Sequence, residues 1–400
     1  GTALFYNDLL SFDGYVNVHL SESDLATLVV QGDIGQNELT GDTKVYKLMP
    51  VADPAVSGTA TFAKRQNGST LVTVALDGTQ AGATHPSHIH ANTIAQGGSI
   101  VINLKSVDGT TGLAISQVDT LNNGMPITYE ELLDFNGYLN VHTGSTFVVQ
   151  ADIGGNELTG NSKVYTMMPV ANPAVTGTAT FEKRKKGTTL VTIALTGTAA
   201  GASYPSHFHA NTIAETGGIV IHLKNVDGTT GRAVTSVDTL NNGMPVTYEQ
   251  LLDFNGYINV HTGGTFVAQV DIGQNELTGE RKQYALNEIG GSGVSGSATF
   301  EKRKNGKAQI TLALGGTTAG GDHPSHIHAN NAATGGGIVL DLKNVTGATG
   351  KSVTSVNTMK DGSAVTYDQL INYNGHINVH LSPAQLGTRI AQGNIGFNVP

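Results

Sequence analysis

Histidine is the residue type of this chain whose spacing suggests chemistry. Only 14 of the 400 residues are histidine, yet most of them fall into three groups that repeat in register. Each group has a His-x-His pair and a third histidine 54 positions after the first, and successive groups lie 119 positions apart. The members are His88, His90, His142, His207, His209, His261, His326, His328 and His380. Three neutral imidazoles suit copper or zinc, so each group is a candidate metal site.

The remaining features near these groups have simpler interpretations. His85 and His323 precede the pair in the first and third copies, but the second copy has Tyr204 there, so a required ligand role is not expected. His222 and His376 each occur once and are expected at the surface. The nine repeated histidines also have an alternative interpretation, in which they fill a polar cluster under a loop and bond to backbone carbonyls.

Strands must position these histidines. In the first copy, alternating runs at residues 59–65 and 70–76 flank an Asn67-Gly68 turn, which predicts a hairpin. The period of two within His-x-His points both imidazoles to one face of a strand. To complete the site, the later Asn-Val-His strand must lie beside it. One short helix is expected where Thr128 and Glu131 are spaced as a capping box.

The composition indicates an all-β chain of several domains. Charged residues make up 13% and glycine is abundant, which suits short strands joined by turns. Regularly spaced strands predict antiparallel sandwich or barrel domains. There is no cysteine, so neither disulfides nor thiolate metal sites can form. With junctions at Pro or Gly clusters, the period predicts a closing half-repeat at 1–48 and full repeats at 49–168, 169–287 and 288–400.

Charge and hydropathy exclude two classes of partner. The net charge of −9 argues against nucleic-acid binding, which favours a basic face. No apolar run approaches the roughly 18 residues of a membrane span. No signal peptide is visible, although a mature secreted chain would look the same.

The first copy reads Gly82-Ala-Thr-His85-Pro-Ser-His88-Ile-His90, then Gly137-Tyr-Leu-Asn-Val-His142. This pattern resembles the chordin-type (CHRD) domain of secreted proteins over essentially the whole chain. That family in turn is similar to the copper/zinc superoxide dismutase sandwich, an eight-stranded Greek key. The resemblance implies that His326, His328 and His380 are copper ligands and that Arg389 steers an anion.

Departures from the enzymes limit what the resemblance implies. The stretch from Ala91 to Ser99 contains neither the bridging histidine nor the aspartate of a zinc loop, so no zinc is expected. The positions aligned with Arg389 are apolar in the other copies, where they hold Leu28, Phe147 and Phe266. Two of the three complete units therefore lack the group that would attract a small anion.

Three functions remain open, and the first is favoured. The chain is expected to be an extracellular or cell-surface structural protein with a copper site in each repeat and no enzymatic activity. The alternatives are a superoxide dismutase-like enzyme and a copper-binding or storage protein. Residues 1–48 supply closing strands without an opening hairpin. Their unpaired edges predict self-association into a homopolymer or filament.

Overall fold

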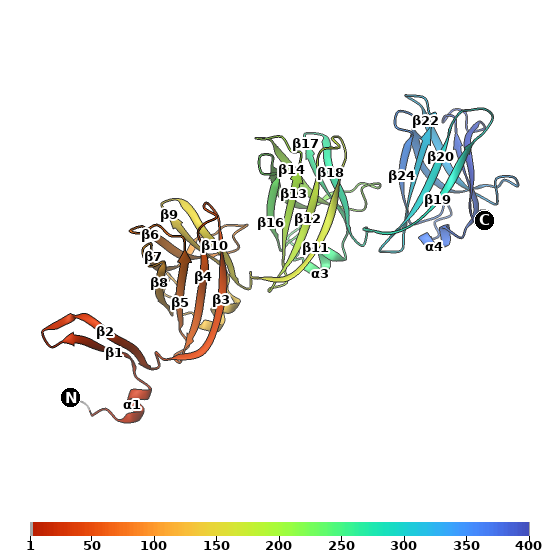
Figure 1. Cartoon of the computed structure of the whole chain (residues 1–400). Coiled ribbons are helices and arrows are strands. Elements are labelled where there is room, and N and C mark those ends of the chain that lie inside the picture. Colours follow the sequence, from red (N-terminus) through yellow and green to blue (C-terminus); the bar gives the residue numbers. More distant parts are fainter. Residues whose placement is uncertain (1–2, 400) are drawn as a thin grey trace. The chain divides into compact units, whose positions relative to one another are not determined.

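The computed structural model describes residues 3–399. Three closed antiparallel barrels of eight strands each follow a separate two-stranded sheet along the chain (Figure 1). We call them barrel 1 (β3–β10), barrel 2 (β11–β18) and barrel 3 (β19–β26). The predicted all-β class with tandem antiparallel domains is confirmed.

The helices and strands have the following bounds. The N-terminal segment contains α1 (Tyr6–Leu10), β1 (Asp13–Ser21) and β2 (Asp24–Gly35). Barrel 1 contains β3 (Leu39–Pro50), β4 (Ser57–Arg65), β5 (Thr70–Asp77), β6 (Thr84–Ala91), β7 (Ile100–Asp108), β8 (Leu113–Val118), α2 (Tyr129–Asp134), β9 (Asn136–Thr143) and β10 (Thr146–Gly154). Barrel 2 contains β11 (Leu158–Pro169), β12 (Thr176–Arg184), β13 (Thr189–Thr196), β14 (Ser203–Ala210), β15 (Ile219–Asp227), β16 (Arg232–Val237), α3 (Tyr248–Leu252), β17 (Asn255–Thr262) and β18 (Thr265–Gly273). Barrel 3 contains β19 (Leu277–Glu288), β20 (Ser295–Arg303), β21 (Ala308–Gly315), β22 (Asp322–Ala329), β23 (Ile338–Thr346), β24 (Lys351–Val356), α4 (Tyr367–Leu370), β25 (Asn374–His380) and β26 (Arg389–Gly396).

The strand order is the same in each barrel. In barrel 1 it runs β10-β3-β4-β5-β8-β7-β6-β9, and β9 pairs with β10 to close the barrel. Strand β5 lies beside β8 and not beside β6, its successor in the chain, which is a Greek-key connection. This connection places β6 next to β9, although about 50 residues separate them in the sequence.

The expected hairpin and helix are both present. Strands β4 and β5 pair across the Asn67-Gly68 turn, where Gly68 has a φ of 81° that favours glycine. At α2 the Thr128 side chain accepts a hydrogen bond from the Glu131 amide, while the Glu131 carboxylate accepts one from the Thr128 amide. No helix within residues 3–399 has the length and apolar character needed to cross a membrane.

The barrels begin earlier than the proline clusters suggest. Strand β3 pairs with β4 from Leu39 to Leu48 and then with β10, where Pro50 lies opposite Val149. The segment between Pro50 and Ser57 therefore joins two strands of one barrel. Proline is tolerated there because it stands at the end of a strand, where the ladder does not need its missing N–H.

Each barrel packs its interior around equivalent aromatic residues. Phe62, Phe181 and Phe300 are fully buried at intervals of 119 residues. The ring of Tyr46 meets Phe62 edge to face at 5.1 Å, and its hydroxyl accepts a hydrogen bond from the Gly154 amide. Along β5 the side chains alternate between buried and partly buried, as expected for a strand with one face on the core.

Candidate metal centre

Adjacent strands place the histidines on the outer face of each barrel. In barrel 1, β6 pairs with β9 so that His88 lies opposite Asn140. Ile89, Leu139 and Val141 alternate with these polar residues and are fully buried in the barrel. The histidines of β6 and β9 therefore share the opposite face.

The other barrels repeat this register. His207 of β14 lies opposite Asn259 of β17, and His326 of β22 lies opposite Asn378 of β25. In each barrel the third histidine follows the paired asparagine by two positions. It therefore returns to the face that carries the His-x-His pair.

In barrels 1 and 2 two of the three imidazoles contact each other. Nε2 of His142 lies 3.2 Å from Nδ1 of His88, and Nε2 of His261 lies 3.3 Å from Nδ1 of His207. His142 donates its Nδ1 hydrogen to the carbonyl of Gly144 at 2.7 Å, because a carbonyl can only accept. Its Nε2 is therefore an acceptor and points at His88. Two nitrogens at this separation also span about the distance between two ligands of a tetrahedral ion.

The second histidine of each pair is oriented by a loop carbonyl. Nδ1 of His90, His209 and His328 lies 2.9, 2.8 and 2.9 Å from the carbonyl oxygens of Gly98, Gly217 and Gly336. This contact fixes the proton on Nδ1 and leaves Nε2 with its lone pair, the atom that a metal-binding histidine offers in this tautomer. In all three barrels that Nε2 is buried and has no hydrogen-bond partner within residues 3–399.

Barrel 3 brings three imidazoles together. One ring nitrogen from each of His326, His328 and His380 lies within 4.8 Å of the others, and in the described part of the chain no other group of three metal-ligating residues does so. Nδ1 of His326 and Nε2 of His380 are also buried without a hydrogen-bond partner in this part of the chain. Small ring rotations would bring three such nitrogens to the roughly 2.0–2.1 Å that a metal requires. This group could hold a metal ion.

Two neighbours distinguish the barrel 3 cluster. His376 is buried and stacks on His328 at 5.1 Å, whereas His209 stacks on Tyr257 at the same place in barrel 2. The expectation that His376 lies at the surface is wrong, because its strand faces the covering loop, where Nδ1 contacts the Asn330 carbonyl. On the next strand, Oδ1 of Asp341 lies 3.7 Å from Nε2 of His326.

Burial lowers the pKa of four of the clustered histidines. Burial, followed by the neighbouring imidazoles, lowers the pKa of His207 to about 4. Burial is also the main cause that lowers the pKa of His88, His326 and His380. A neutral imidazole is the form that binds metals, so the lowered pKa values favour that form at these four residues.

The other singled-out residues have structural contacts. His85 and His323 are buried beside the site, and their Nδ1 atoms contact the Thr143 hydroxyl and the Leu381 carbonyl. His222 is exposed, as expected, although its ring lies 5.1 Å from that of His207.

The approach to the site differs between barrels. In barrel 3, Arg389 lies opposite His380 in the strand pairing, whereas Phe147 and Phe266 take this place in barrels 1 and 2. In barrel 1 an open cavity of about 210 Å³ is lined by His88, His90, Ile100, Asn140, His142 and Phe147. This volume is below the roughly 300–1,000 Å³ of pockets for organic ligands, so it suits an ion or a few waters.

A comparison with known protein families finds one match in this chain. The model of the CHRD domain matches residues 155–266, which run from the end of barrel 1 into β18 and include His207, His209 and His261. The chain therefore contains a CHRD domain, and three barrels of the same design make it a tandem-repeat protein. No curated protein matches the chain.

Proposed function

We propose that this chain is a structural tandem-repeat protein whose barrels carry histidine sites for copper, with the most complete site in barrel 3. The observation that carries the metal proposal is the convergence of His326, His328 and His380 within 4.8 Å. The ring nitrogens of these histidines that are buried without a hydrogen-bond partner cost free energy unless a ligand binds to them. A bound ion would link β22 to β25 and stabilise the barrel.

Copper fits this donor set better than its competitors. The chain has no cysteine, so the site offers no thiolate. Imidazole nitrogens suit copper and zinc, and copper is the stronger binder of the two in the usual affinity order. Calcium and magnesium prefer oxygen ligands and are disfavoured.

Metal analysis of the purified protein tests this proposal. Mass spectrometry should give bound copper, and the copper EPR spectrum should carry nitrogen hyperfine splitting. A His326→Asn variant should lose the signal assigned to barrel 3. His222→Asn is the control, because this exposed histidine belongs to another barrel and should leave the barrel 3 signal unchanged. A protein that takes up no copper and whose EPR spectrum shows no nitrogen ligands would contradict the proposal.

Weak superoxide dismutase activity in barrel 3 is a second candidate. It is favoured by one observation, the pairing of Arg389 with His380. The positive charge of Arg389 beside the site would attract a small anion, and the other two barrels have a phenylalanine at this position. Copper-loaded protein and an Arg389→Phe variant should be compared in a superoxide assay. Fast turnover that survives the change and involves all three barrels would instead favour an enzyme over a structural protein.

We further propose that the N-terminal sheet mediates self-association outside the cell. Strands β1 and β2 pair only with each other within residues 3–399. Val16, Val18 and Val30 are each at least 50% exposed, and Val18 lies directly opposite Val30. A two-stranded sheet with an exposed apolar face is marginally stable alone and favours contact with another surface.

Light scattering of a double variant tests this assembly. Val16→Lys with Val18→Lys adds charge to the exposed face and should reduce the mass of any assembly. These changes are preferable to deleting residues 1–48, because that deletion would remove most of β3 from barrel 1. Val164→Lys, at an exposed valine of barrel 2, is the control and should leave the mass of the assembly unchanged. An assembly whose mass is unchanged by the double variant would exclude this sheet as its cause.

A further inference from the structure

The loop between β14 and β15 controls the orientation of His209. Its residue Gly217 supplies the carbonyl that accepts the Nδ1 hydrogen of His209 at 2.8 Å. Asn211 and Thr216 in this loop have φ values of 66° and 61°, a left-handed conformation that is unfavourable for threonine. Contacts elsewhere must therefore hold the loop in place.

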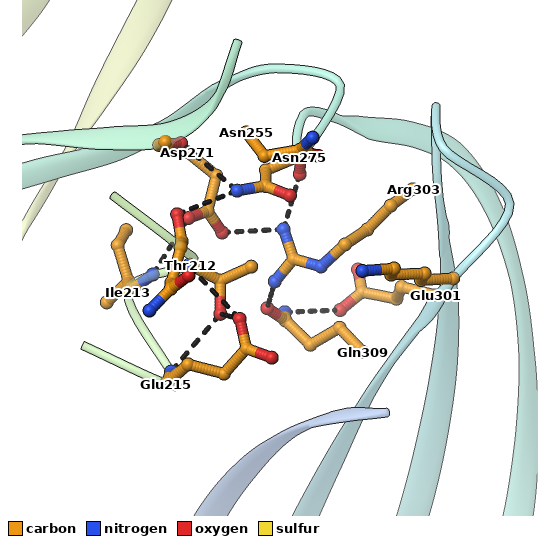
Figure 2. A network of polar contacts seen from close by, with 12 residues as sticks. Thr212, Ile213, Glu215, Asn255, Asp271, Asn275, Glu301, Arg303 and Gln309 are labelled. Carbon is orange, nitrogen blue, oxygen red and sulfur yellow. Dashed lines mark hydrogen bonds and ion pairs between the residues drawn. The ribbon is translucent and has the colours of Figure 1, made fainter. Parts of the chain in front are cut away.

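Asp271 and Asn275 hold this loop, and one arginine holds both of them. Oδ1 of Asp271 accepts the Ile213 amide hydrogen at 2.9 Å, and the Asn275 side chain donates to the Asn211 carbonyl at 2.7 Å. Arg303 donates to Oδ2 of Asp271 at 2.7 Å and also to the Asn275 carbonyl. Figure 2 shows the guanidinium of Arg303 between these groups. Arg303 belongs to β20 of barrel 3, whereas the loop belongs to barrel 2.

The ion pair between Arg303 and Asp271 is buried, so loss of either partner should disturb the other. The Arg303 side chain is fully buried and Asp271 is 11% exposed. Burial raises the pKa of the Asp271 carboxyl, and the charge of Arg303 opposes that rise. Without Arg303 the carboxylate would be buried with no opposite charge, so it would tend to protonate or move toward water.

The same arrangement recurs 119 residues earlier. Arg184 of β12 donates to Oδ2 of Asp152 at 2.7 Å, and Oδ1 of Asp152 accepts the Ile94 amide hydrogen at 2.8 Å. Ile94 lies in the loop whose Gly98 carbonyl orients His90.

Barrel 3 holds its loop without a charge. Its equivalent loop is bound by Asn394, which accepts the Ala332 amide hydrogen at 2.8 Å. A neutral amide does not need an arginine to compensate it. Barrel 3 therefore shows that an asparagine can hold this loop in place of the Arg–Asp pair.

We propose that Arg184 and Arg303 are positioning residues for the histidine sites of the preceding barrels. Each holds a carboxylate that fixes a loop, and the loop carbonyl orients the second histidine of the pair. The consequence for metal binding rests on the proposed function. The orientation of His90 and His209 does not require a metal.

The metal-free full chain provides the first test. In an Arg303→Met variant, deuterium exchange of the loop peptide containing Ile213 should rise about tenfold or more, and the Nδ1–H signal of His209 in NMR should broaden or disappear, since the order of the loop depends on this pair. Arg184→Met is the matched control, with the same effects on Ile94 and His90 but none on His209.

A double variant separates positioning from general stability. Asp271→Asn combined with Arg303→Met copies the neutral arrangement of barrel 3 and should restore both the slow exchange and the His209 signal. Should Arg303→Met prevent barrel 3 from folding, Arg303→Lys should show the same changes to a smaller degree. Unchanged exchange and an unchanged His209 signal in the Lys and Met variants would overturn the proposal. So would a double variant that folds but does not recover.

Copper titration provides the second test, in a chain with His142→Asn and His380→Asn to isolate barrel 2. Arg303→Met should weaken copper binding about tenfold, the lower end of the range for outer-sphere partners of metal ligands. A barrel 2 that binds no copper even with Arg303 present would contradict the proposed function for that barrel. The exchange and NMR measurements would still decide the positioning role.

Discussion

Barrels 2 and 3 contain the same histidine motif but arrange it differently. In barrel 2 the rings of His207 and His261 stack at 29° and contact each other through nitrogen atoms. In barrel 3 the rings of His326 and His380 are tilted by 57°, and three donor atoms converge. The ligand residues alone therefore do not decide the site.

The turn after the third histidine explains much of this difference. In barrel 2, Gly263 has a φ of 55° and closes a short turn whose carbonyl fixes Nδ1 of His261 at 2.9 Å. In barrel 3 eight residues separate His380 from its paired residue Arg389, against four between His261 and Phe266 in barrel 2, and Nε2 of His380 remains unpartnered within residues 3–399. The short turn thus fixes the His261 ring against His207, whereas the longer loop of barrel 3 accompanies the tilted His380 ring and the converging nitrogens.

Removal of a barrel 3 ligand should have the largest effect on metal binding. His380→Ala should weaken copper binding at the tightest site by more than about 100-fold. Removing a residue that hydrogen-bonds to a metal ligand typically costs about 10–100-fold in metal affinity, and removing the ligand itself should cost more. Isothermal titration with copper measures this change. The matched control, His142→Ala in barrel 1, should leave the tightest site intact. Equal losses in both variants would show that the barrels are equivalent and that the comparison is wrong.

Exchange of the turns should reduce the difference between the barrels. Replacing residues 381–388 with the Thr-Gly-Gly-Thr sequence of residues 262–265 should weaken copper binding in barrel 3 about tenfold. The reason is that the introduced glycine carbonyl would bond to Nδ1 of His380 and turn its ring away from the other two ligands. The reciprocal exchange should strengthen binding in barrel 2. The proportion of copper in each barrel can be followed by EPR. If affinity is unaffected in both directions, the turn does not set the site.

Acidification should affect barrel 2 through His207. The folded pKa of about 4 lies below the ordinary value of 6.5, so the unfolded chain binds the proton first. Stability should therefore decrease as pH falls from about 6.5 to about 4. Thermal unfolding across this range measures the change, and His207→Asn should remove part of the dependence. A melting temperature that rises on acidification would contradict this prediction.

The stacking partner should have the smallest effect. Tyr257→His gives barrel 2 the ring pair of barrel 3, in which His328 stacks on His376. Copper affinity should change by no more than about threefold, because either aromatic pair contributes a similar 0.5–1.5 kcal/mol. His376→Tyr is the reciprocal control in barrel 3. A change above tenfold in either variant would make this ring, and not the turn, the main difference between the sites.

Several features of the fold could be predicted from local sequence. The Asn67-Gly68 turn and the alternating runs beside it specify the β4–β5 hairpin, and Thr128 with Glu131 specifies the start of α2. These predictions succeed because turns and caps depend on neighbouring residues. The start of each barrel could not be placed in this way, because β3 belongs to barrel 1 through pairing with a strand about 100 residues later.

Some contacts left only weak signals in the sequence. Arg65, Arg184 and Arg303 repeat at intervals of 119, but within short basic clusters they resemble exposed hairpin residues. Arg184 is fully buried against a carboxylate from the preceding repeat. Periodic spacing could have identified these arginines, but not their partners.

The sequence by itself determined the repeat, the strand periodicity and the identity of the candidate ligands, because these depend on residue type and spacing. The tertiary structure decided which imidazoles meet. That outcome depends on the pairing of strands distant in sequence and on the length of the turn after the third histidine. Ring orientation is set by hydrogen bonds and packing from residues far apart in the chain, and spacing does not encode them.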